Sequence, residues 1–263
     1  MRRRKMPEGG DGPMRVVTLN TWKGDGDYAA RLAAMAAGLA ALRPDIVALQ
    51  EVLKAPEAGH DTAAHIANAL KLTASVLPLR WKVRTVDGRA VDSTSGLALL
   101  SRAPLRNPRS VRLASDPRDG ERAALIADMA MDGQMLTVAC LHLTHLSDAD
   151  ELRRQQWREV AAALPGTVPV VVAGDFNAPI ETFDLTDSRF ADSRQTCGEP
   201  VQSTVLGHAP ASFDHVLFSP GCGLVPTRWR TALGESQPGT TVTPSDHLAV
   251  VVDFEAAMPT MHR

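Results

Sequence analysis

The chain has 263 residues, of which 44% are hydrophobic, and this length can bury a substantial core, with one domain expected rather than two. No apolar run is long enough to cross a membrane. The formal net charge is −2 and aromatic residues make up 4% of the chain, so nucleic acid is a possible partner that the charge does not indicate.

The two ends differ in composition from the rest of the chain. Residues 1–13 contain Arg2, Arg3, Arg4 and Lys5 and then a stretch rich in Pro and Gly, without the apolar centre of a secretory signal, which predicts a disordered basic leader. Residues 14–257 are predicted to form a single domain, and residues 258–263 a C-terminal tail. Three cysteines without metal-ligand spacing, at positions 140, 197 and 222, favour reduced thiols and a cytoplasmic location.

The first elements alternate between strand and helix. Residues 14–19 predict a strand that ends at Asn20, and residues 27–42 predict an amphipathic helix with Asp27 as its N-cap. Residues 45–52 predict a second strand with Glu51 near its end. A charged residue that closes an apolar strand is hard to explain by packing, because charged side chains are rarely buried unpaired.

The sequence next predicts a helix, short strands, a further strand and an edge-like segment, at residues 62–72, 74–86, 95–101 and 104–113. Asp61 is the expected N-cap of the helix. Gly96 within the further strand suggests a close approach of another backbone segment.

A hairpin is predicted from residues 122–131 and 134–141, turned at Asp132-Gly133, and its second strand runs into His142. His145 follows three residues later, a spacing that would put it on the opposite face of a strand. We therefore expect one functional histidine here, His142, with His145 as a loop or cap residue.

A helix over residues 148–164 precedes a run of valines, which predicts a buried strand. The run ends in Gly-Asp-Phe-Asn-Ala-Pro, where Asp175 and Asn177, two residues apart, point to the same side. Such oxygen-bearing groups at the end of a stiff strand suit a water molecule or a hard metal ion beside a phosphate. The alternative is an ordinary Asx-turn.

Irregular structure with one short helix is expected over residues 180–212, where substrate specificity often resides. Two further strands, at 213–218 and 248–254, carry polar residues at their ends. Asp214 lies near the start of the first, and Asp246 and His247 come directly before the second.

Potentially catalytic groups thus stand at six strand ends: Asn20, Glu51, His142, Asp175 with Asn177, Asp214, and Asp246 with His247. Turns alone do not require His or Glu, so this set indicates phosphate-ester hydrolysis. A carboxylate such as Glu51 would hold Mg²⁺ or Mn²⁺ and leave coordination positions for water and phosphate oxygens. We expect Asp214 to hold His247, Asp175 to orient or deprotonate the attacking water, and Asn177 to bind the phosphate.

Seven motifs resemble the endonuclease/exonuclease/phosphatase superfamily, which is related to deoxyribonuclease I. They are Leu-Asn-Thr-Trp at 19–22, Leu-Gln-Glu at 49–51, Ser-Gly-Leu-Ala-Leu-Leu-Ser-Arg at 95–102, Leu-His-Leu at 141–143, Gly-Asp-Phe-Asn at 174–177, Phe-Asp-His-Val at 213–216 and Ser-Asp-His at 245–247. They keep the order of the family and cover nearly the whole chain after Met14.

The resemblance implies a four-layer α/β/β/α sandwich of two packed mixed sheets with outer helices, and one divalent-metal site. It implies these roles: metal ligands Glu51, Asn20 and Asp246; water activation by Asp175 with Asn177 beside it; phosphate-facing His142 and His247, the latter paired with Asp214; and a phosphate-side Arg122. Relatives that cut at apurinic sites have a tyrosine after the histidine strand, whereas the tyrosine of this chain is Tyr28. A long basic loop for duplex DNA is also missing, so that activity is not predicted.

The predicted function is a divalent-metal-dependent phosphoesterase in which water attacks a phosphodiester, or a phosphomonoester, in line. Its substrate could be nucleic acid, a phospholipid head group, or a sugar or inositol phosphate. Two other classes stay open. One is a binding module that keeps the fold without turnover, and the other is a protein that binds nucleic acid through the Arg2–Lys5 tail.

Overall fold

The structure is a computed structural model that describes residues 12–256, except residues 87, 132, 186–188, 209 and 237–240. The predicted C-terminal tail, residues 1–11 of the predicted leader and Asp132 of the predicted hairpin turn lie outside the described residues. Within these limits, no helix is long and apolar enough to cross a membrane.

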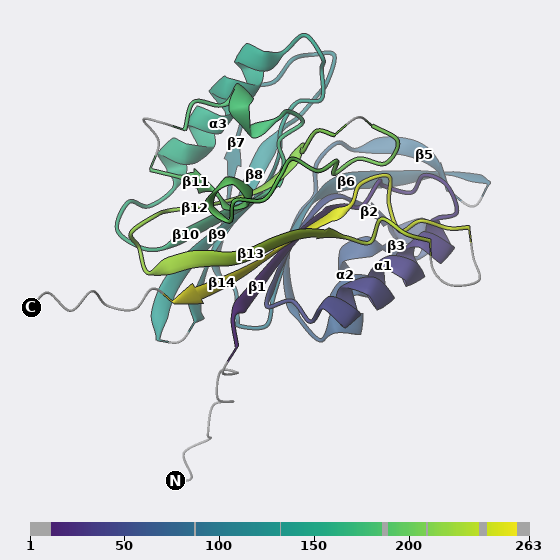
Figure 1. Cartoon of the computed structure of the whole chain (residues 1–263). Coiled ribbons are helices and arrows are strands. Elements are labelled where there is room, and N and C mark those ends of the chain that lie inside the picture. The colour runs from purple at the N-terminus through teal and green to yellow at the C-terminus, as the bar shows by residue number, and fades with distance from the viewer. Residues whose placement is uncertain are drawn as a thin grey trace, which may run out of the picture.

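Two mixed sheets form the centre of the structure (Figure 1). In the first sheet the strand order is β13 (Leu224–Ala232), β14 (Ala249–Ala256), β1 (Met14–Asn20), β2 (Ile46–Ala55), β6 (Arg89–Ser101) and β4 (Thr73–Leu77), with β3 (His60–Asp61) on β2 and β5 (Lys82–Val86) on β6. In the second sheet the order is β11 (Ala191–Asp192), β12 (Asp214–Phe218), β10 (Val170–Asp175), β9 (Gln134–His142), β8 (Ala123–Met131) and β7 (Arg106–Arg112).

Each sheet contains one parallel pair, and in each case a helix makes the connection. Strands β1 and β2 are joined by α1 (Tyr28–Leu42), and β9 and β10 by α3 (Asp150–Ala163). Parallel neighbours need such a crossover, and the crossover helix covers one face of the sheet. In both pairs, the carboxyl ends of the two strands therefore lie side by side at one edge.

The helices cover the outer faces of the two sheets (Figure 1). Helices α1 and α2 (Thr62–Leu70) pack on the first sheet through a cluster that includes Leu39 and Ile66, and α3 packs on the second sheet through Trp157. A third cluster fills the space between the sheets. The prediction of a four-layer sandwich is confirmed. The remaining helices are short: η1 (Pro56–Ala58), η2 (Ile180–Thr182) and α4 (Ser193–Thr196).

Both predicted N-caps are confirmed, and the third long helix begins later than predicted. The carboxylate of Asp27 accepts a hydrogen bond from Ala30 N at 3.1 Å, and that of Asp61 accepts one from Ala64 N at 2.9 Å. Helix α3 begins at Asp150 instead of Asp148, and its N-cap residue makes no side-chain hydrogen bond. The Asp148 carboxylate instead pairs with Arg118 at 3.0 Å.

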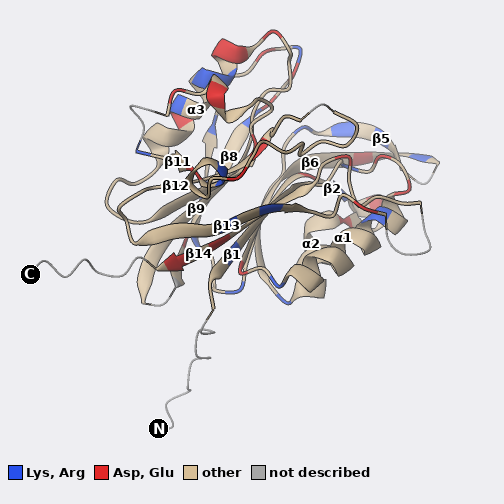
Figure 2. Cartoon of the chain, viewed as in Figure 1, with Lys and Arg blue, Asp and Glu red and all other residues tan. Residues whose placement is uncertain are grey.

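Strands β6 and β13 differ most from the prediction. Strand β6 begins at Arg89, six residues before the predicted start, and its first half pairs with β5 in a hairpin that projects from the sheet and carries basic residues (Figure 2). Strand β13 was not predicted, because Pro226 interrupts its pattern and its pairing register shifts between Pro226 and Arg228.

A bulge in β2 sets the position of Glu51. Leu49 pairs with Ala98 and Val52 with Gly96, so Gln50 and Glu51 together face a single residue of β6. Glu51 has a φ of +56°, in the left-handed region that side chains other than glycine rarely adopt. Such bulges redirect side chains, and this one leaves Gln50 fully buried between the sheets while Glu51 turns toward an open pocket.

Glycines allow the backbone to pack closely at two of the predicted motifs. A Cβ atom on Gly96 would overlap the carbonyl oxygen of Leu77, which confirms the predicted close approach. A Cβ atom on Gly174 would overlap the backbone of Leu141 in the neighbouring strand β9. Gly174 directly precedes Asp175, so the position of Asp175 at the end of β10 depends on this close contact.

Gly174→Ala should therefore lower the free energy of unfolding by about 1–3 kcal/mol, because backbone atoms cannot move aside as a side chain can. Chemical denaturation of the variant measures this loss. Gly12→Ala is the matched control, since a Cβ atom there meets nothing within 4 Å. Equal stability of the Gly174 variant and the wild type would contradict the packing described here.

Candidate active site

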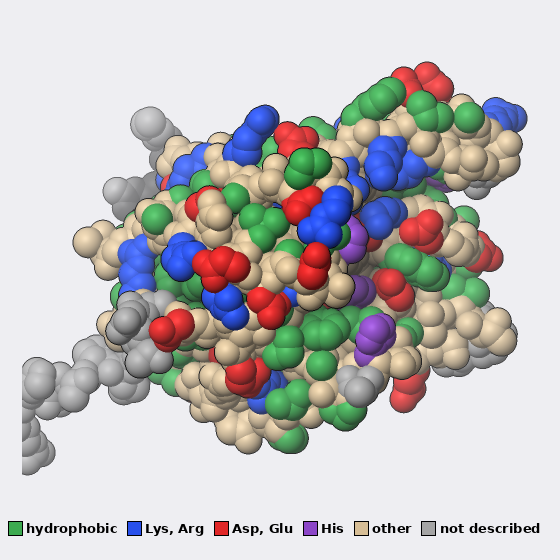
Figure 3. All heavy atoms as spheres, turned by 90° about the horizontal axis from the view of Figure 1, so that it is seen from above, with side chains coloured by type: hydrophobic (Ala, Val, Ile, Leu, Met, Phe, Trp, Pro, Cys, Tyr) green, Lys and Arg blue, Asp and Glu red, His purple; other side chains and the backbone are tan. Residues whose placement is uncertain are grey.

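The polar strand ends meet at one edge of the two sheets. Asp175, the last residue of β10, lies opposite His142 of β9 and Asp214 of β12 in the pairing register. Asn20, the last residue of β1, reaches Asp175 from the other sheet. Viewed from above, histidine side chains lie in a hollow on this face of the molecule (Figure 3).

Asp175 is buried, with 1% of its surface exposed, and both of its carboxylate oxygens accept hydrogen bonds. Asn20 Nδ2 donates to Oδ2 at 3.0 Å, and the backbone N of Asn177 donates to Oδ1 at 2.8 Å. Burial, and then the neighbouring Asp214 carboxylate, raise the pKa of Asp175 above its ordinary value. A carboxylate with a raised pKa is a better acceptor for a proton from water.

Asp214 and His247 form the predicted pair, with Nδ1 of the imidazole 2.9 Å from Oδ2 of the carboxylate. Burial alone would lower the pKa of His247, but the charge of Asp214 and its hydrogen bond outweigh burial and raise the pKa to about 10. The other ring nitrogen, Nε2, lies 3.9 Å from Oδ2 of Asp175. His247 is therefore an imidazolium at neutral pH, and its free donor lies close to the Asp175 carboxylate.

Ser245 fixes this segment to the end of β1. Its hydroxyl donates to the carbonyl oxygen of Asn20 at 2.6 Å and accepts from the backbone N of His247 at 3.2 Å. The segment before β14 is thereby tied to the residue that orients Asp175.

His142 ends β9 as predicted, and its Nε2 lies 3.5 Å from Oδ2 of Asp175. Burial, and then the positive charges of Arg122 and His247, lower its pKa well below the ordinary value. The two histidines of the site thus differ in charge, His142 being neutral and His247 protonated. The Asp214 carboxylate, 2.9 Å from the His247 ring, keeps that ring protonated.

Glu51 lies on the wall of a pocket that His142, Arg122, Lys23 and Arg80 also line. Its side chain is 14% exposed, and one carboxylate oxygen lies 3.0 Å from Lys23 Nζ. Lys23 directly follows the Asn-Thr-Trp motif, a position from which sequence analysis could have identified it. Arg80 follows no motif of the predicted site and could not have been found in this way.

Arg122 is held in the pocket wall by Asp119, which the sequence analysis did not select. Two guanidinium nitrogens of Arg122 donate to the Asp119 carboxylate at 2.8 and 2.5 Å, and Asp119 is 1% exposed. His145 Nδ1 lies 2.8 Å from the same carboxylate, and Arg80 lies 3.6 Å from it. The predicted loop residue His145 therefore contacts the same buried acid as Arg122 and Arg80.

The predicted metal ligands do not form one tight group of carboxylates. Among the His, Cys, Asp and Glu side chains of the described residues, the trio with ligand atoms within 4.8 Å of one another is Asp175, Asp214 and His247.

The predicted ligand Asp246 instead accepts a hydrogen bond from Ser245 Oγ at 3.2 Å. Asn20 Oδ1 accepts one from Trp22 N at 3.0 Å. The set of Glu51, Asn20 and Asp246 stays a prediction.

Asn177 forms the Asx-turn that was the alternative explanation of this motif. Its backbone N binds Asp175, and its Nδ2 donates to the carbonyl oxygen of Leu143 at 3.0 Å. One proton of this amide is used in the hydrogen bond, and the other has no acceptor among the described residues, so it can make the predicted contact with phosphate. The turn thus links the ends of β9 and β10.

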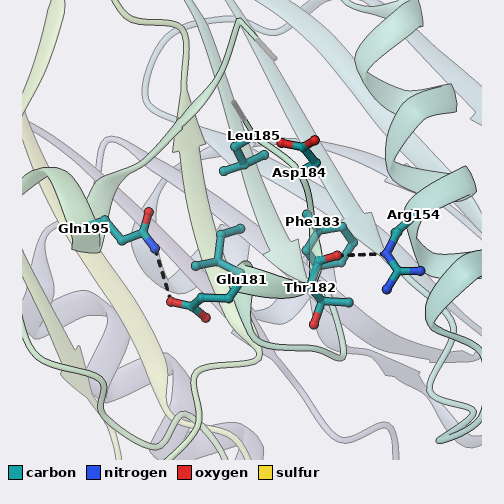
Figure 4. A pocket seen from close by; sticks show the side chains of 8 residues that line it. Arg154, Glu181, Thr182, Phe183, Asp184, Leu185 and Gln195 are labelled. Atoms are coloured by element: carbon teal, nitrogen blue, oxygen red, sulfur yellow. Dashed lines mark hydrogen bonds between the residues drawn. The ribbon is translucent and has the colours of Figure 1, made fainter. Parts of the chain in front are cut away.

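A second pocket, which shares no residue with this site, lies beside η2 and α4 (Figure 4). Its polar groups bind one another: Arg154 donates to Thr182 O at 3.0 Å, and Gln195 donates to the Glu181 carboxylate at 3.2 Å. These contacts explain the polar lining without a ligand.

The sequence pattern of the Endonuclease/Exonuclease/phosphatase family matches residues 17–247, so the chain belongs to this family. The family is named for enzymes that hydrolyse phosphate esters, which agrees with the buried carboxylates and histidines at the strand ends. A search among curated proteins finds no match.

Solved structures show the same fold. The human Nocturnin catalytic domain, with a bound sulfate anion, has a TM-score of 0.74 and 22% identity, and the alignment covers 93% of this chain and 95% of that one. An endonuclease/exonuclease/phosphatase from Beutenbergia cavernae has a TM-score of 0.71 and 21% identity, covering 93% and 72%. Truncated TDP2 from Caenorhabditis elegans has a TM-score of 0.67 and 18% identity, covering 92% and 97%.

The raised pKa of His247 predicts a ring that stays protonated above pH 8 in metal-free protein, which the NMR titration of its ring protons measures. Asp214→Asn should return the pKa toward the ordinary value of 6.5. Because the folded pKa exceeds the unfolded one, the pair stabilises the fold fully below about pH 6.5. This contribution is lost as the pH rises toward 10. A wild-type midpoint near 6.5 would contradict the pairing.

Proposed function

We propose that the protein is a divalent-metal-dependent phosphoesterase that hydrolyses a phosphodiester by in-line attack of water. One observation carries the proposal. A buried carboxylate with a raised pKa, Asp175, lies 3.9 Å from the donor nitrogen of a protonated imidazole, His247. A proton acceptor and a proton donor so close to each other suit a reaction that adds water to a phosphate ester.

Asp175 is the proposed acceptor of the proton of the attacking water. The hydrogen bonds from Asn20 and Asn177 fix both of its oxygens, so that the carboxylate is oriented before the substrate binds. Its burial excludes bulk water and strengthens its interaction with a water molecule held at the pocket.

His247 and His142 are the proposed contacts of the phosphoryl oxygens. Protonated His247 donates from Nε2 and stabilises the negative charge that develops in the transition state, while Asp214 holds its Nδ1. Neutral His142 supplies a hydrogen bond without a second full charge. Arg122, held by Asp119, adds a fixed positive charge on the same wall as His142.

The residue types of the site fit a hard divalent cation, since carboxylate and amide oxygens are its preferred ligands. Oδ1 of Asp214 is buried and has no hydrogen-bond partner among the described residues, so this oxygen is available to a cation. His247 is a poor ligand, because Asp214 occupies its Nδ1 and the ring is protonated. We therefore keep Glu51 as the main proposed ligand, with Asn20 and Asp246 in support.

When bound, Mg²⁺ or Mn²⁺ would neutralise phosphate charge and stabilise the leaving oxygen. The sulfate bound to the catalytic domain of human Nocturnin supports a site for a tetrahedral anion in this fold. Nucleic acid, a lipid head group and a sugar or inositol phosphate all present such a group. A cytoplasmic location remains part of the proposal, consistent with the free thiols of the three cysteines.

Hydrolysis of bis-p-nitrophenyl phosphate tests this function. We expect release of p-nitrophenol with Mg²⁺ or Mn²⁺ and none with chelator. Glu51→Gln should lower kcat/KM by about 10²-fold or more, because a charge that acts in the transition state is lost. Glu121→Gln is the matched control, a carboxylate in the same pocket that pairs with Arg112 at the surface. Equal activity with chelator, or in the Glu51 variant, would refute metal-dependent catalysis.

Asp175→Asn should lower kcat by about 10²–10⁴-fold with little change in KM, since an amide cannot accept the proton of water. The shape of the residue is kept, so the thermal unfolding midpoint serves as the control for folding. Full activity of a folded variant would remove Asp175 from the proposed mechanism. Activity on p-nitrophenyl phosphate alone would assign the protein as a phosphomonoesterase.

A further inference from the structure

The β5–β6 hairpin carries basic residues on one of its two faces. Residues that lie directly opposite each other in an antiparallel pair share a face, and so do alternate residues of one strand. Lys82 pairs with Ser93 and Arg84 with Val91, so these residues lie on one face. Arg89, four residues before Ser93 on β6, lies on it too.

This face continues into the candidate active site. Ser95, two residues after Ser93 on β6, lines the pocket that holds Glu51 and His142. Arg84 links the two serines, since it donates to Ser93 Oγ at 2.7 Å and to Ser95 Oγ at 3.0 Å. Burial and then the nearby Arg80 lower the pKa of the Arg84 guanidinium, against the opposing charges of Asp25 and Glu51.

Arg80 continues the basic residues from the hairpin to the pocket. It lines the same pocket and lies 3.6 Å from the Asp119 carboxylate, which already binds Arg122 and His145. The guanidinium groups of Arg80 and Arg122 thus share a single buried acid, so positive charge exceeds negative charge in this cluster. In the view from above, basic side chains lie between the hollow with the histidines and the projecting hairpin (Figure 3).

The outer cations of this face are free. Lys82 and Arg89 are exposed, and neither forms an ion pair with any described residue. Asp92 pairs with Val83 and therefore lies on the opposite face. Ala55 and Ala58 cover Val86 and Val91 in the middle of the basic face, so the cations surround a small apolar patch that is already buried.

We propose that this face, defined by Arg80, Lys82, Arg84 and Arg89, is a track for the backbone of a single-stranded polynucleotide that reaches the active site. The inference rests on the proposed phosphodiesterase function and names its substrate class. Cations in a row contact successive phosphates and bind without regard to base sequence. Arg84 is fixed by its serines, whereas Lys82 and Arg89 can turn toward a ligand.

The dimensions suit a strand of several nucleotides. From Lys82 to Val86, which pairs with Arg89, strand β5 advances by four residues, or about 13 Å at roughly 3.3 Å per residue. This length corresponds to about four stacked nucleotides at about 3.4 Å each. A lone phosphodiester without further phosphates would use only the inner end of the track.

The other surface that cations attract is an anionic membrane, and the distribution of apolar residues favours a polynucleotide. The exposed apolar side chains of this region are Val83, at 58%, and Trp81, at 63%. Val83 lies on the face opposite to Lys82 and Arg84, because side chains alternate along a strand. A membrane that took up these apolar side chains would therefore meet the face turned away from the active site.

The test compares single-stranded oligothymidylates of two and twelve nucleotides with bis-p-nitrophenyl phosphate, in wild type and in the double variant Lys82→Glu/Arg89→Glu. We expect kcat/KM of the variant to fall about 10-fold or more on the twelve-mer and to stay unchanged on bis-p-nitrophenyl phosphate, which carries no further phosphate. The salt dependence of twelve-mer binding should weaken by about 1.4 in log–log slope, for two lost phosphate contacts.

Arg106→Glu/Arg228→Glu is the matched control. Both arginines are exposed on β-strands, at the far edges of the two sheets, and the change in net charge is the same. An equal loss in this control would show a general effect of charge and overturn the track. An unchanged twelve-mer rate in the hairpin variant would overturn it as well.

Fluorescence anisotropy of the labelled twelve-mer in chelator separates this inference from the proposed function. If no substrate is hydrolysed, the proposed function fails, while weaker binding by the hairpin variant than by the control still supports the track. Equal binding by both would refute it. Sedimentation with vesicles containing anionic phospholipid completes the test: a loss of vesicle binding by the hairpin variant, with twelve-mer binding intact, would assign the hairpin to a membrane instead.

Discussion

The burial of the Asp175 carboxylate is the constraint on which the other features of the site depend. A carboxylate removed from water is costly unless its oxygens are hydrogen-bonded. The structure meets this requirement with Asn20, which comes from the other sheet, and with the turn at Asn177. The position of Asn20 is in turn fixed by the Ser245 hydroxyl, so three segments distant in the sequence are held together around one side chain. The raised pKa of Asp175 follows from the same burial, and structure and proposed chemistry thus have one physical origin.

The packing of the backbone makes this burial possible. Gly174 lets β10 lie against Leu141, and the parallel register then sets Asp175 beside His142. On the first sheet, the bulge in β2 performs a complementary task, because it buries Gln50 between the sheets and turns Glu51 toward the pocket. Gln50 Nε2 lies 3.3 Å from Sγ of Cys140 in the second sheet, so polar contacts also join the two sheets next to the site. Gly174 and the left-handed backbone conformation of Glu51 thus position the carboxylates of the site.

The arrangement of charge matters more here than its total. The net charge of −2 gives no indication of a polyanionic substrate. The fold nevertheless gathers cations around Asp119 and along one face of the β5–β6 hairpin, while Asp92 lies on the other face. The two active-site histidines show the same principle at short range. Asp214, 2.9 Å away, raises the pKa of His247, whereas burial and the charges of Arg122 and His247 lower the pKa of His142 although Asp175 lies 3.5 Å from its ring. Neighbouring side chains, rather than the net charge, therefore determine the charge at each of these sites.

The layered fold was expected from the resemblance of seven motifs to a known family. The sequence itself predicted most strands and two N-caps, because hydrophobic periodicity and capping residues act over a few neighbouring positions. It also located the polar strand ends, since His and Glu at the ends of apolar strands have no role in packing. The sequence did not predict the start of α3, where Asp148 pairs with Arg118 instead of beginning the helix. It did not predict β13 either, because Pro226 interrupts the strand pattern. Which polar groups are in contact depends on the tertiary structure. The contact of Asn20 with Asp175 spans 155 positions, and the grouping of Arg80, Asp119 and His145 comes from loops without periodicity. Such contacts depend on how the two sheets pack and in which register their strands pair, and no local pattern encodes either.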